Sequence, residues 1–157
     1  MQILFMCTHN SCRSILSEAL FNHLAPAGMT AVSSGSWPSD QVNVRALKTL
    51  EAVCISTDGL TSKASDVFEH SPPDIVITVC DRAAGEACPV FFGPALKAHW
   101  GLTDPSAVVG SEDEIEAAFQ ATLAIIDKRV RAFIALPFAK MNADQFPASV
   151  VEIGLIN

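Results

Sequence analysis

The chain has 157 residues and a mass of 16.7 kDa, enough for one domain with a sizeable hydrophobic core. Its mean hydropathy of +0.34 and its 50% of hydrophobic residues favour an α/β protein whose sheet is covered on both faces. The net charge of −7 argues against a nucleic-acid partner, and no apolar stretch approaches the roughly 18 residues of a membrane span, so we expect no membrane partner either.

The N-terminal residues form an apolar run from Met1 to Met6 without the basic leader of a signal peptide, so we expect a cytoplasmic protein. The run predicts a short buried strand that ends at Cys7. An amphipathic helix follows and stops at Pro26 and Gly28. The residues of its apolar face are Leu16, Ala19, Leu20 and Leu24. A cysteine therefore occupies a tight loop between a strand and a helix.

The loop after this strand predicts an oxyanion site. Its backbone N–H groups can turn inward around a tetrahedral anion, and the helix N-terminus adds partial positive charge. The same field favours a thiolate at Cys7, which makes it a candidate nucleophile. The planar guanidinium of Arg13 suits two oxygens of the anion, and the Ser14 hydroxyl is placed to reach the sulfur. The predicted binding residues are Thr8, His9, Asn10, Ser11, Cys12, Arg13 and Ser14.

Further elements alternate along the chain without repeats or linkers. The patterns predict a short strand over Ala31–Ser33, a helix over Val44–Val53 and a buried strand over Asp74–Val79. A long helix begins at a capping box of Ser111 and Glu114 and continues to Pro137. Alternation of this kind indicates a doubly wound α/β domain with a parallel sheet. The segment Val150–Ile153 fits either a strand or an ordered extension.

The carboxyl ends of parallel strands share one edge of a sheet, and ligands bind at that edge. Cys7 ends the first strand, and Cys80 ends the Asp74–Val79 strand. Asp104 follows His99–Leu102, which is predicted to be a short strand or the exit from one. Cys80 also fits a buried spectator, and Asp104 fits a turn cap before a proline. We favour functional roles because both residues fall on the Cys7 edge, which otherwise has no carboxylate.

Five cysteines in a reducing compartment do not predict a disulfide scaffold, and no C-x2-C pair supports structural zinc. We therefore expect neither a metal nor another cofactor. Cys12 is expected to contribute its backbone only, and Cys54 to lie in the core. The His9 side chain is expected to face outward, although a role in stabilising the thiolate is an alternative.

Three motifs carry a resemblance to a known family. They are Cys7–Ser14, Val76–Cys80 with the later pair Cys88-Pro89, and His99–Pro105. Together they resemble thioredoxin-coupled arsenate reductases, which have the low-molecular-weight protein tyrosine phosphatase fold. The resemblance implies a single α/β domain over residues 1–136 with a central four-stranded parallel sheet flanked by helices, followed by an extension of unknown role over residues 137–157.

The resemblance also implies the reaction. The substrate would be arsenate, and the reductant would be thioredoxin or a glutaredoxin-like protein. Cys7 would attack arsenic while Asp104 acts as general acid. Cys80 would then attack the Cys7 sulfur and release arsenite, and Cys88 would move the disulfide to Cys80–Cys88. Arg13 would hold the anion throughout.

Two other functions use the same loop. A phosphatase would act through a phosphocysteine, but phosphorus(V) takes no electrons from thiols, so a second and a third cysteine would have no use. Phosphatases of this fold commonly carry an aromatic residue after the Asp-Pro pair, where this chain has Ser106, and the chain has no tyrosine. A non-catalytic thiol redox sensor would need neither Arg13 nor Asp104.

The chain departs from the family pattern at one position. Some family members hold a potassium ion behind the anion loop with oxygen ligands that match Asn10, Glu18 and Ser33. They add an acidic residue where this chain has Lys63. A lysine ammonium repels a cation, so we expect Lys63 to occupy its place and pair with Glu18. The alternative is an exposed Lys63 with no partner.

Overall fold

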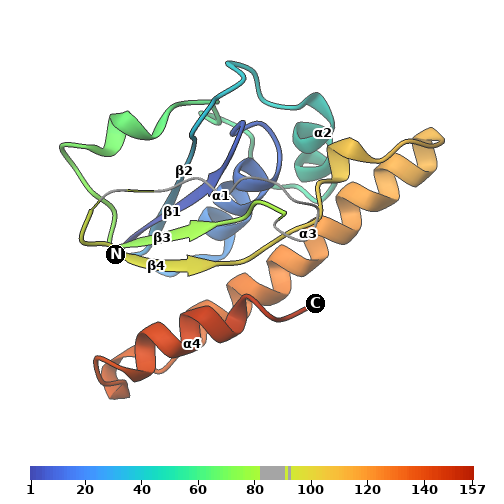
Figure 1. Cartoon of the computed structure of the whole chain (residues 1–157). Coiled ribbons are helices and arrows are strands. Elements are labelled where there is room, and N and C mark those ends of the chain that lie inside the picture. The colour runs from blue at the N-terminus through green and yellow to red at the C-terminus, as the bar shows by residue number, and fades with distance from the viewer. Residues whose placement is uncertain (82–90, 92) are drawn as a thin grey trace.

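The structure is a computed structural model that describes residues 1–81, 91 and 93–157. Within these ranges one sheet of four parallel strands has the order β2-β1-β3-β4 (Figure 1). The strands are β1 (Gln2–Cys7), β2 (Thr30–Gly35), β3 (Ile75–Thr78) and β4 (Leu96–His99). The predicted α/β fold with a four-stranded parallel sheet is confirmed.

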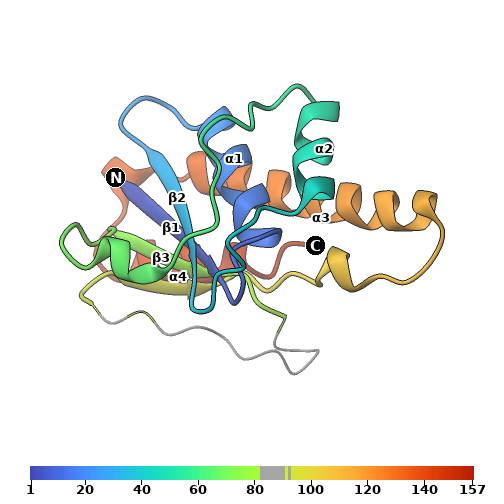
Figure 2. The same ribbon diagram turned by 90° about the horizontal axis from the view of Figure 1, so that it is seen from above.

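Helices α1, α2 and α3 lie on one side of the sheet, as the view from above shows (Figure 2). The α-helices are α1 (Arg13–Leu24), α2 (Val44–Ala52), α3 (Glu112–Ile134) and α4 (Gln145–Ile153). The short 3-10 helices are η1 (Ser65–Phe68), η2 (Pro105–Ala107) and η3 (Phe138–Lys140). No helix in the described ranges combines the length and apolar character that crossing a membrane requires.

Strand β1 contributes to the packing on both faces of the sheet because successive side chains of a strand point in opposite directions. Ile3 and Phe5 join the large core beneath the helices. Leu4 and Met6 join a smaller cluster on the other face with Phe68 of η1. Each buried side chain of this size contributes about 1.5–3 kcal/mol. The first strand is therefore fixed from both sides before it delivers Cys7 to the edge of the sheet.

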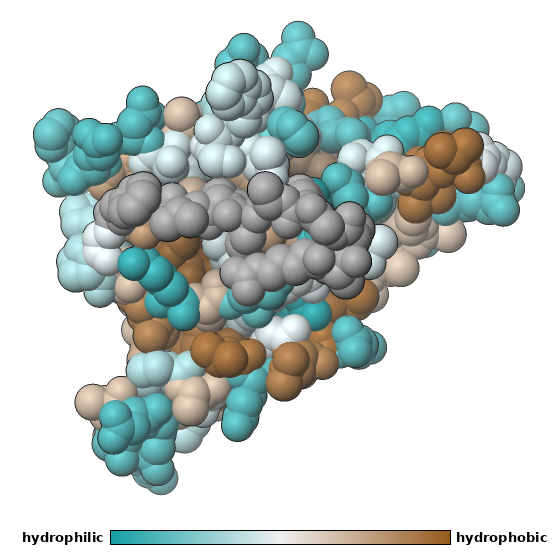
Figure 3. All heavy atoms as spheres, in the orientation of Figure 1, coloured by the Kyte–Doolittle hydropathy of each residue, from teal (hydrophilic) through white to brown (hydrophobic). Residues whose placement is uncertain are grey.

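Aromatic rings fill the space between the sheet and α3. The Phe5 ring lies 6.0 Å from both the Phe21 and the Trp100 rings, and Phe133 lies 5.7 Å from Phe21, measured between centroids. These tilted contacts match the preferred geometry of aromatic pairs. The cluster joins β1, α1 and α3 to the segment that follows β4. On the one face of the molecule that Figure 3 draws, hydrophobic residues lie among hydrophilic ones.

The segment Val150–Ile153, predicted as either a strand or an ordered extension, is not a strand, because it ends helix α4. The Asn142 side chain accepts from the N–H groups at the start of that helix, and Val150 and Ile153, three residues apart, both face the core. Cys54 is exposed rather than buried: it follows α2 with a positive φ of 59°, and this left-handed turn directs it out of the core.

Candidate active site

Three carbonyl groups of the loop from Cys7 to Cys12 point away from its interior. The N–H groups of Trp37, Ser39 and Asn43 donate to the carbonyls of Thr8, His9 and Ser11 at 2.8, 3.0 and 2.8 Å. Because carbonyl and N–H groups of a peptide point in opposite directions, the loop N–H groups are left to face the interior. Inward N–H groups of this kind are what an oxyanion cradle needs.

Close packing against β2 holds the loop in this shape. A Cβ atom at Gly35 would stand 2.6 Å from the Thr8 carbonyl oxygen and 3.0 Å from the Asn10 nitrogen, so only glycine fits there. Sequence reasoning missed Gly35. The available signal was a glycine at the carboxyl end of a strand, where a neighbouring loop must approach its backbone.

Cys7 lies at the centre of the cradle and is 3% exposed. The Asn10 N–H donates to its Sγ at 3.2 Å, and the Ser14 Oγ lies 3.1 Å from the same sulfur. Ser14 Oγ also accepts from the Asn10 side-chain amide at 2.8 Å, which leaves the hydroxyl proton of Ser14 for the sulfur. The Cys7 sulfur therefore has two hydrogen-bond donors within reach, and it lies close to the N-terminus of α1.

The guanidinium of Arg13 spans the cradle and the segment after β4. It is 3% exposed, and it donates to the Leu102 carbonyl at 3.1 Å and to Asp104 Oδ2 at 3.0 Å. The other oxygen of Asp104 accepts from the N–H and the hydroxyl of Ser106 at the start of η2. Asp104 therefore both faces the site and caps a turn, so the two interpretations of this residue are compatible.

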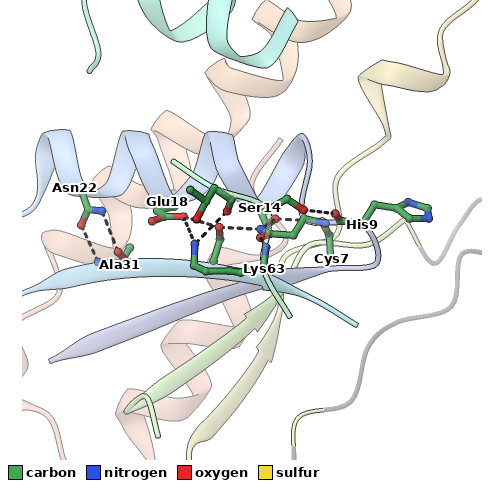
Figure 4. A network of polar contacts seen from close by, with 11 residues as sticks. Cys7, His9, Ser14, Glu18, Asn22, Ala31 and Lys63 are labelled. Carbon is green, nitrogen blue, oxygen red and sulfur yellow. Dashed lines mark hydrogen bonds and ion pairs between the residues drawn. The ribbon is translucent and has the colours of Figure 1, made fainter. Parts of the chain in front are cut away.

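The other loop side chains differ in exposure. The His9 side chain is exposed, and Figure 4 shows it pointing away from the polar network, as expected. Cys12 is buried directly before α1. Its burial, and to a smaller extent the negative charge of Asp104, raises the pKa of its thiol far above the ordinary value. Cys12 is thus a protonated neighbour of Cys7. Thr8 and Ser11 are partly buried.

Cys80 lies on the same edge of the sheet as Cys7. The Val79 N–H donates to the Met6 carbonyl at 2.8 Å, so the residue after Val79 follows β3 beside the end of β1. Cys80 is completely buried. Cys88, the third predicted thiol, lies outside the described residues. The structure brings Cys7, Arg13, Cys80 and Asp104 to one edge.

Behind the loop, Asn10 connects four parts of the chain. Its side-chain amide donates to Ser14 Oγ and Ser33 Oγ, both at 2.8 Å, and its Oδ1 accepts from the Lys63 N–H at 2.8 Å. Ser33 Oγ in turn donates to Glu18 Oε2 at 2.5 Å. The loop, α1, β2 and the segment before η1 are held together by one buried network.

Lys63 pairs with Glu18 as expected, with its Nζ 3.8 Å from Glu18 Oε2 and its side chain only 25% exposed. These residues do not fit a potassium ion. The ammonium is already beside the carboxylate that such an ion would need, while the oxygens of Asn10 and Ser33 are engaged in the hydrogen bonds of the network. Burial raises the pKa of Glu18 above its ordinary value of 4.5, and Ser33 and Lys63 hold back part of the rise.

Comparison with known proteins agrees with this architecture. The family described as low molecular weight phosphotyrosine protein phosphatase matches residues 2–145, and the chain belongs to this family. A protein of Halalkalibacterium halodurans named arsenate reductase is 31% identical over 131 residues, which cover 83% of this chain and 93% of that protein.

Two solved structures extend the comparison. Arsenate reductase from Archaeoglobus fulgidus has a TM-score of 0.72 at 25% identity, covering 85% of this chain and 99% of that one. A thioredoxin-dependent arsenate reductase from Corynebacterium glutamicum has a TM-score of 0.55 at 26% identity, covering 83% of this chain and 61% of that one. The family match over residues 2–145 includes the loop, the sheet edge and α3.

Exchange of potassium for sodium at constant ionic strength should leave the melting temperature and the affinity for phosphate unchanged, because the Lys63 ammonium already neutralises Glu18. The matched variant is Lys63→Glu, which sets a second carboxylate beside Glu18. Its melting temperature should be higher in a potassium or sodium salt than in a choline salt. Thermal melts and phosphate titrations in the three salts measure this. A potassium-specific gain in the wild-type chain would contradict it.

Lys63→Met should destabilise the fold more at pH 7 than at pH 4. The raised pKa of Glu18 gives a stabilising contribution at low pH that is lost as pH rises through the folded-state pKa. Without Lys63 the pKa of Glu18 rises further. The free energy of unfolding at pH 7 therefore falls by about a further 1–2 kcal/mol. Urea unfolding at both pH values measures the difference, and in a Glu18→Gln background it should vanish. Equal destabilisation at both pH values would count against the pairing.

Proposed function

We propose that this chain is an arsenate reductase that converts arsenate to arsenite with electrons from its own thiols. The observation that carries the proposal is the position of Cys7, whose sulfur receives two hydrogen-bond donors inside an oxyanion cradle while Cys80 follows the neighbouring strand on the same edge. The relatives named arsenate reductase support the choice of substrate.

Binding and attack come first. The inward N–H groups and the Arg13 guanidinium hold the arsenate oxygens, since both present donors to the cradle. The Cys7 thiolate attacks arsenic and forms a sulfur–arsenic bond, and one oxygen leaves as water. Asp104, held beside Arg13 and turned toward the site by its contacts with Ser106, supplies the proton for that oxygen.

Reduction follows. The Cys80 thiolate attacks the Cys7 sulfur, and the electron pair of the sulfur–arsenic bond passes to arsenic, which falls from the +5 to the +3 state. Arsenite leaves and a Cys7–Cys80 disulfide remains, so two thiols have been oxidised for two electrons transferred. Cys88 then attacks Cys80, which releases Cys7 as a thiolate and leaves a Cys80–Cys88 disulfide.

An external dithiol regenerates the chain by reducing that last disulfide. The similarity to a structure named as a thioredoxin-dependent arsenate reductase favours thioredoxin over a glutaredoxin-like protein. Paired assays on one preparation test the whole proposal: arsenite formation with reduced thioredoxin, and hydrolysis of a phosphotyrosine analogue. We expect sustained arsenite formation, with ester hydrolysis slow or absent. Rapid hydrolysis without arsenite would instead assign the phosphatase function of the family name.

Cys7→Ser should abolish arsenite formation and any ester hydrolysis together. A serine hydroxyl stays protonated where a thiol ionises, so it cannot form the bond to arsenic. Loss of at least about a thousandfold in kcat is expected for a missing nucleophile. Cys54→Ser is the matched control, because Cys54 is exposed beyond α2, and it should retain wild-type activity. Substantial turnover by Cys7→Ser would remove the loop from catalysis.

Variants of the other two thiols, Cys80 and Cys88, should stop the reaction at different steps. Cys80→Ser should bind oxyanions but form almost no arsenite, because nothing then attacks the Cys7 sulfur. Cys88→Ser should complete about one turnover and stop as a Cys7–Cys80 disulfide. Arsenite counts per chain and mass mapping of thiols distinguish the two variants. If Cys88→Ser turned over repeatedly with thioredoxin, Cys88 would have no part in the relay.

A further inference from the structure

Arg129 lies on the inner face of α3 and is only 2% exposed. No carboxylate in the part of the chain that the structure describes forms an ion pair with it; three backbone carbonyls accept its hydrogen bonds instead. A buried charge costs free energy unless its donors are satisfied, so these carbonyls must stay where they are. Sequence reasoning passed over Arg129, although its place between Ile126 and Val130 on an apolar face was a signal.

Two of the carbonyls belong to the segment that carries Asp104. Arg129 donates through one terminal nitrogen to Trp100 at 3.0 Å and to Gly101 at 3.1 Å. The next carbonyl in the chain, that of Leu102, accepts from Arg13 at 3.1 Å, and Asp104 pairs with Arg13 at 3.0 Å. Two buried arginines from different helices therefore hold one short segment, and the active-site arginine is one of them.

The third carbonyl belongs to the C-terminal tail. Arg129 Nε donates to the Ile156 carbonyl at 2.9 Å, and the Trp100 indole donates to the Val150 carbonyl of α4 at 2.8 Å. The tail and the end of β4 are so close that a Cβ atom at Gly154 would clash with the His99 carbonyl oxygen. The family match ends at residue 145, so most of this contact lies beyond it.

We propose that Arg129 is a positioning residue of the active site, and that the tail after α4 (residues 154–157) helps to hold it through the Ile156 carbonyl. Arg129 acts through Leu102 and Asp104, because fixing Trp100 and Gly101 fixes the carbonyl and the carboxylate that orient Arg13. The inference relies on the proposed function for the roles of Arg13 and Asp104 in chemistry. Its effect on oxyanion binding does not require that arsenate be reduced.

Inorganic phosphate is the probe, titrated by calorimetry at 20 °C and constant ionic strength into folded protein. Arg129→Met should weaken phosphate binding by about tenfold, since small displacements of a binding group have effects of this order. Arg129→Lys should recover part of the loss, because an ammonium still reaches a carbonyl. Deletion of residues 155–157 removes the Ile156 carbonyl and should weaken binding by about threefold.

Arg131→Met is the matched control, because Arg131 lies two residues further along α3, is exposed and pairs with Asp127 at 2.7 Å. It should bind phosphate like the wild type. A fall in melting temperature with unchanged phosphate affinity in Arg129→Met would show a purely structural role and overturn the proposal. If Arg129→Met does not fold, wild-type affinity in both Arg129→Lys and the deletion overturns it.

Arsenite formation is followed on the same preparations. A wild-type chain that forms no arsenite, while phosphate affinity still falls in Arg129→Met, would refute the proposed function and leave the positioning role intact. If the wild type forms arsenite fully and all variants bind phosphate with equal affinity, the positioning role of Arg129 is refuted and the proposed function stands.

Discussion

The hydrogen bonds of Asn10 are the interaction on which the rest of the site depends. Its backbone has a positive φ of 47°, a conformation that costs an ordinary residue about 1–2 kcal/mol. In that conformation its N–H reaches the Cys7 sulfur while its side chain bonds Ser14, Ser33 and the Lys63 N–H. One fully buried amide thus fixes the shape of the loop, the position of the Ser14 hydroxyl beside Cys7 and the distance to two neighbouring segments.

Under the proposed function, the site binds an anion within a chain of net charge −7, so its attraction must be local. The loop N–H groups, the N-terminus of α1 and Arg13 supply it. Glu18, buried behind the loop, would oppose it if its charge were unbalanced. The Lys63 ammonium at 3.8 Å balances that charge from within the chain. The same residue therefore serves the stability of the fold and the electrostatics of the cradle.

Patterns with a direct physical cause were predictable from the sequence. The capping box at Ser111 and Glu114 marks the start of α3 because it satisfies helix N–H groups locally. The rule that the carboxyl ends of parallel strands share an edge predicts that Cys7, Cys80 and Asp104 lie on the same side of the sheet.

What depends on contacts between distant segments was not predictable. The apolar residues of Val150–Ile153 are too few to distinguish a strand from a helix, and the side chain that caps α4 stands eight residues earlier, at Asn142. Arg129 is an ordinary helix residue in sequence, and only folding brings three carbonyls to it. Cys54 faces solvent because the backbone after α2 turns left-handed, which no pattern of polar and apolar residues encodes.

The central claim is that electrons for arsenic come from the thiols of this chain, in a fixed order. A single turnover of the fully reduced wild-type chain with one equivalent of arsenate, and with no other reductant, measures this directly. The account predicts about one arsenite per chain, a Cys80–Cys88 disulfide and Cys7 recovered as a thiol. Chains that remain fully reduced and release no arsenite, while hydrolysing a phosphate ester, would contradict it.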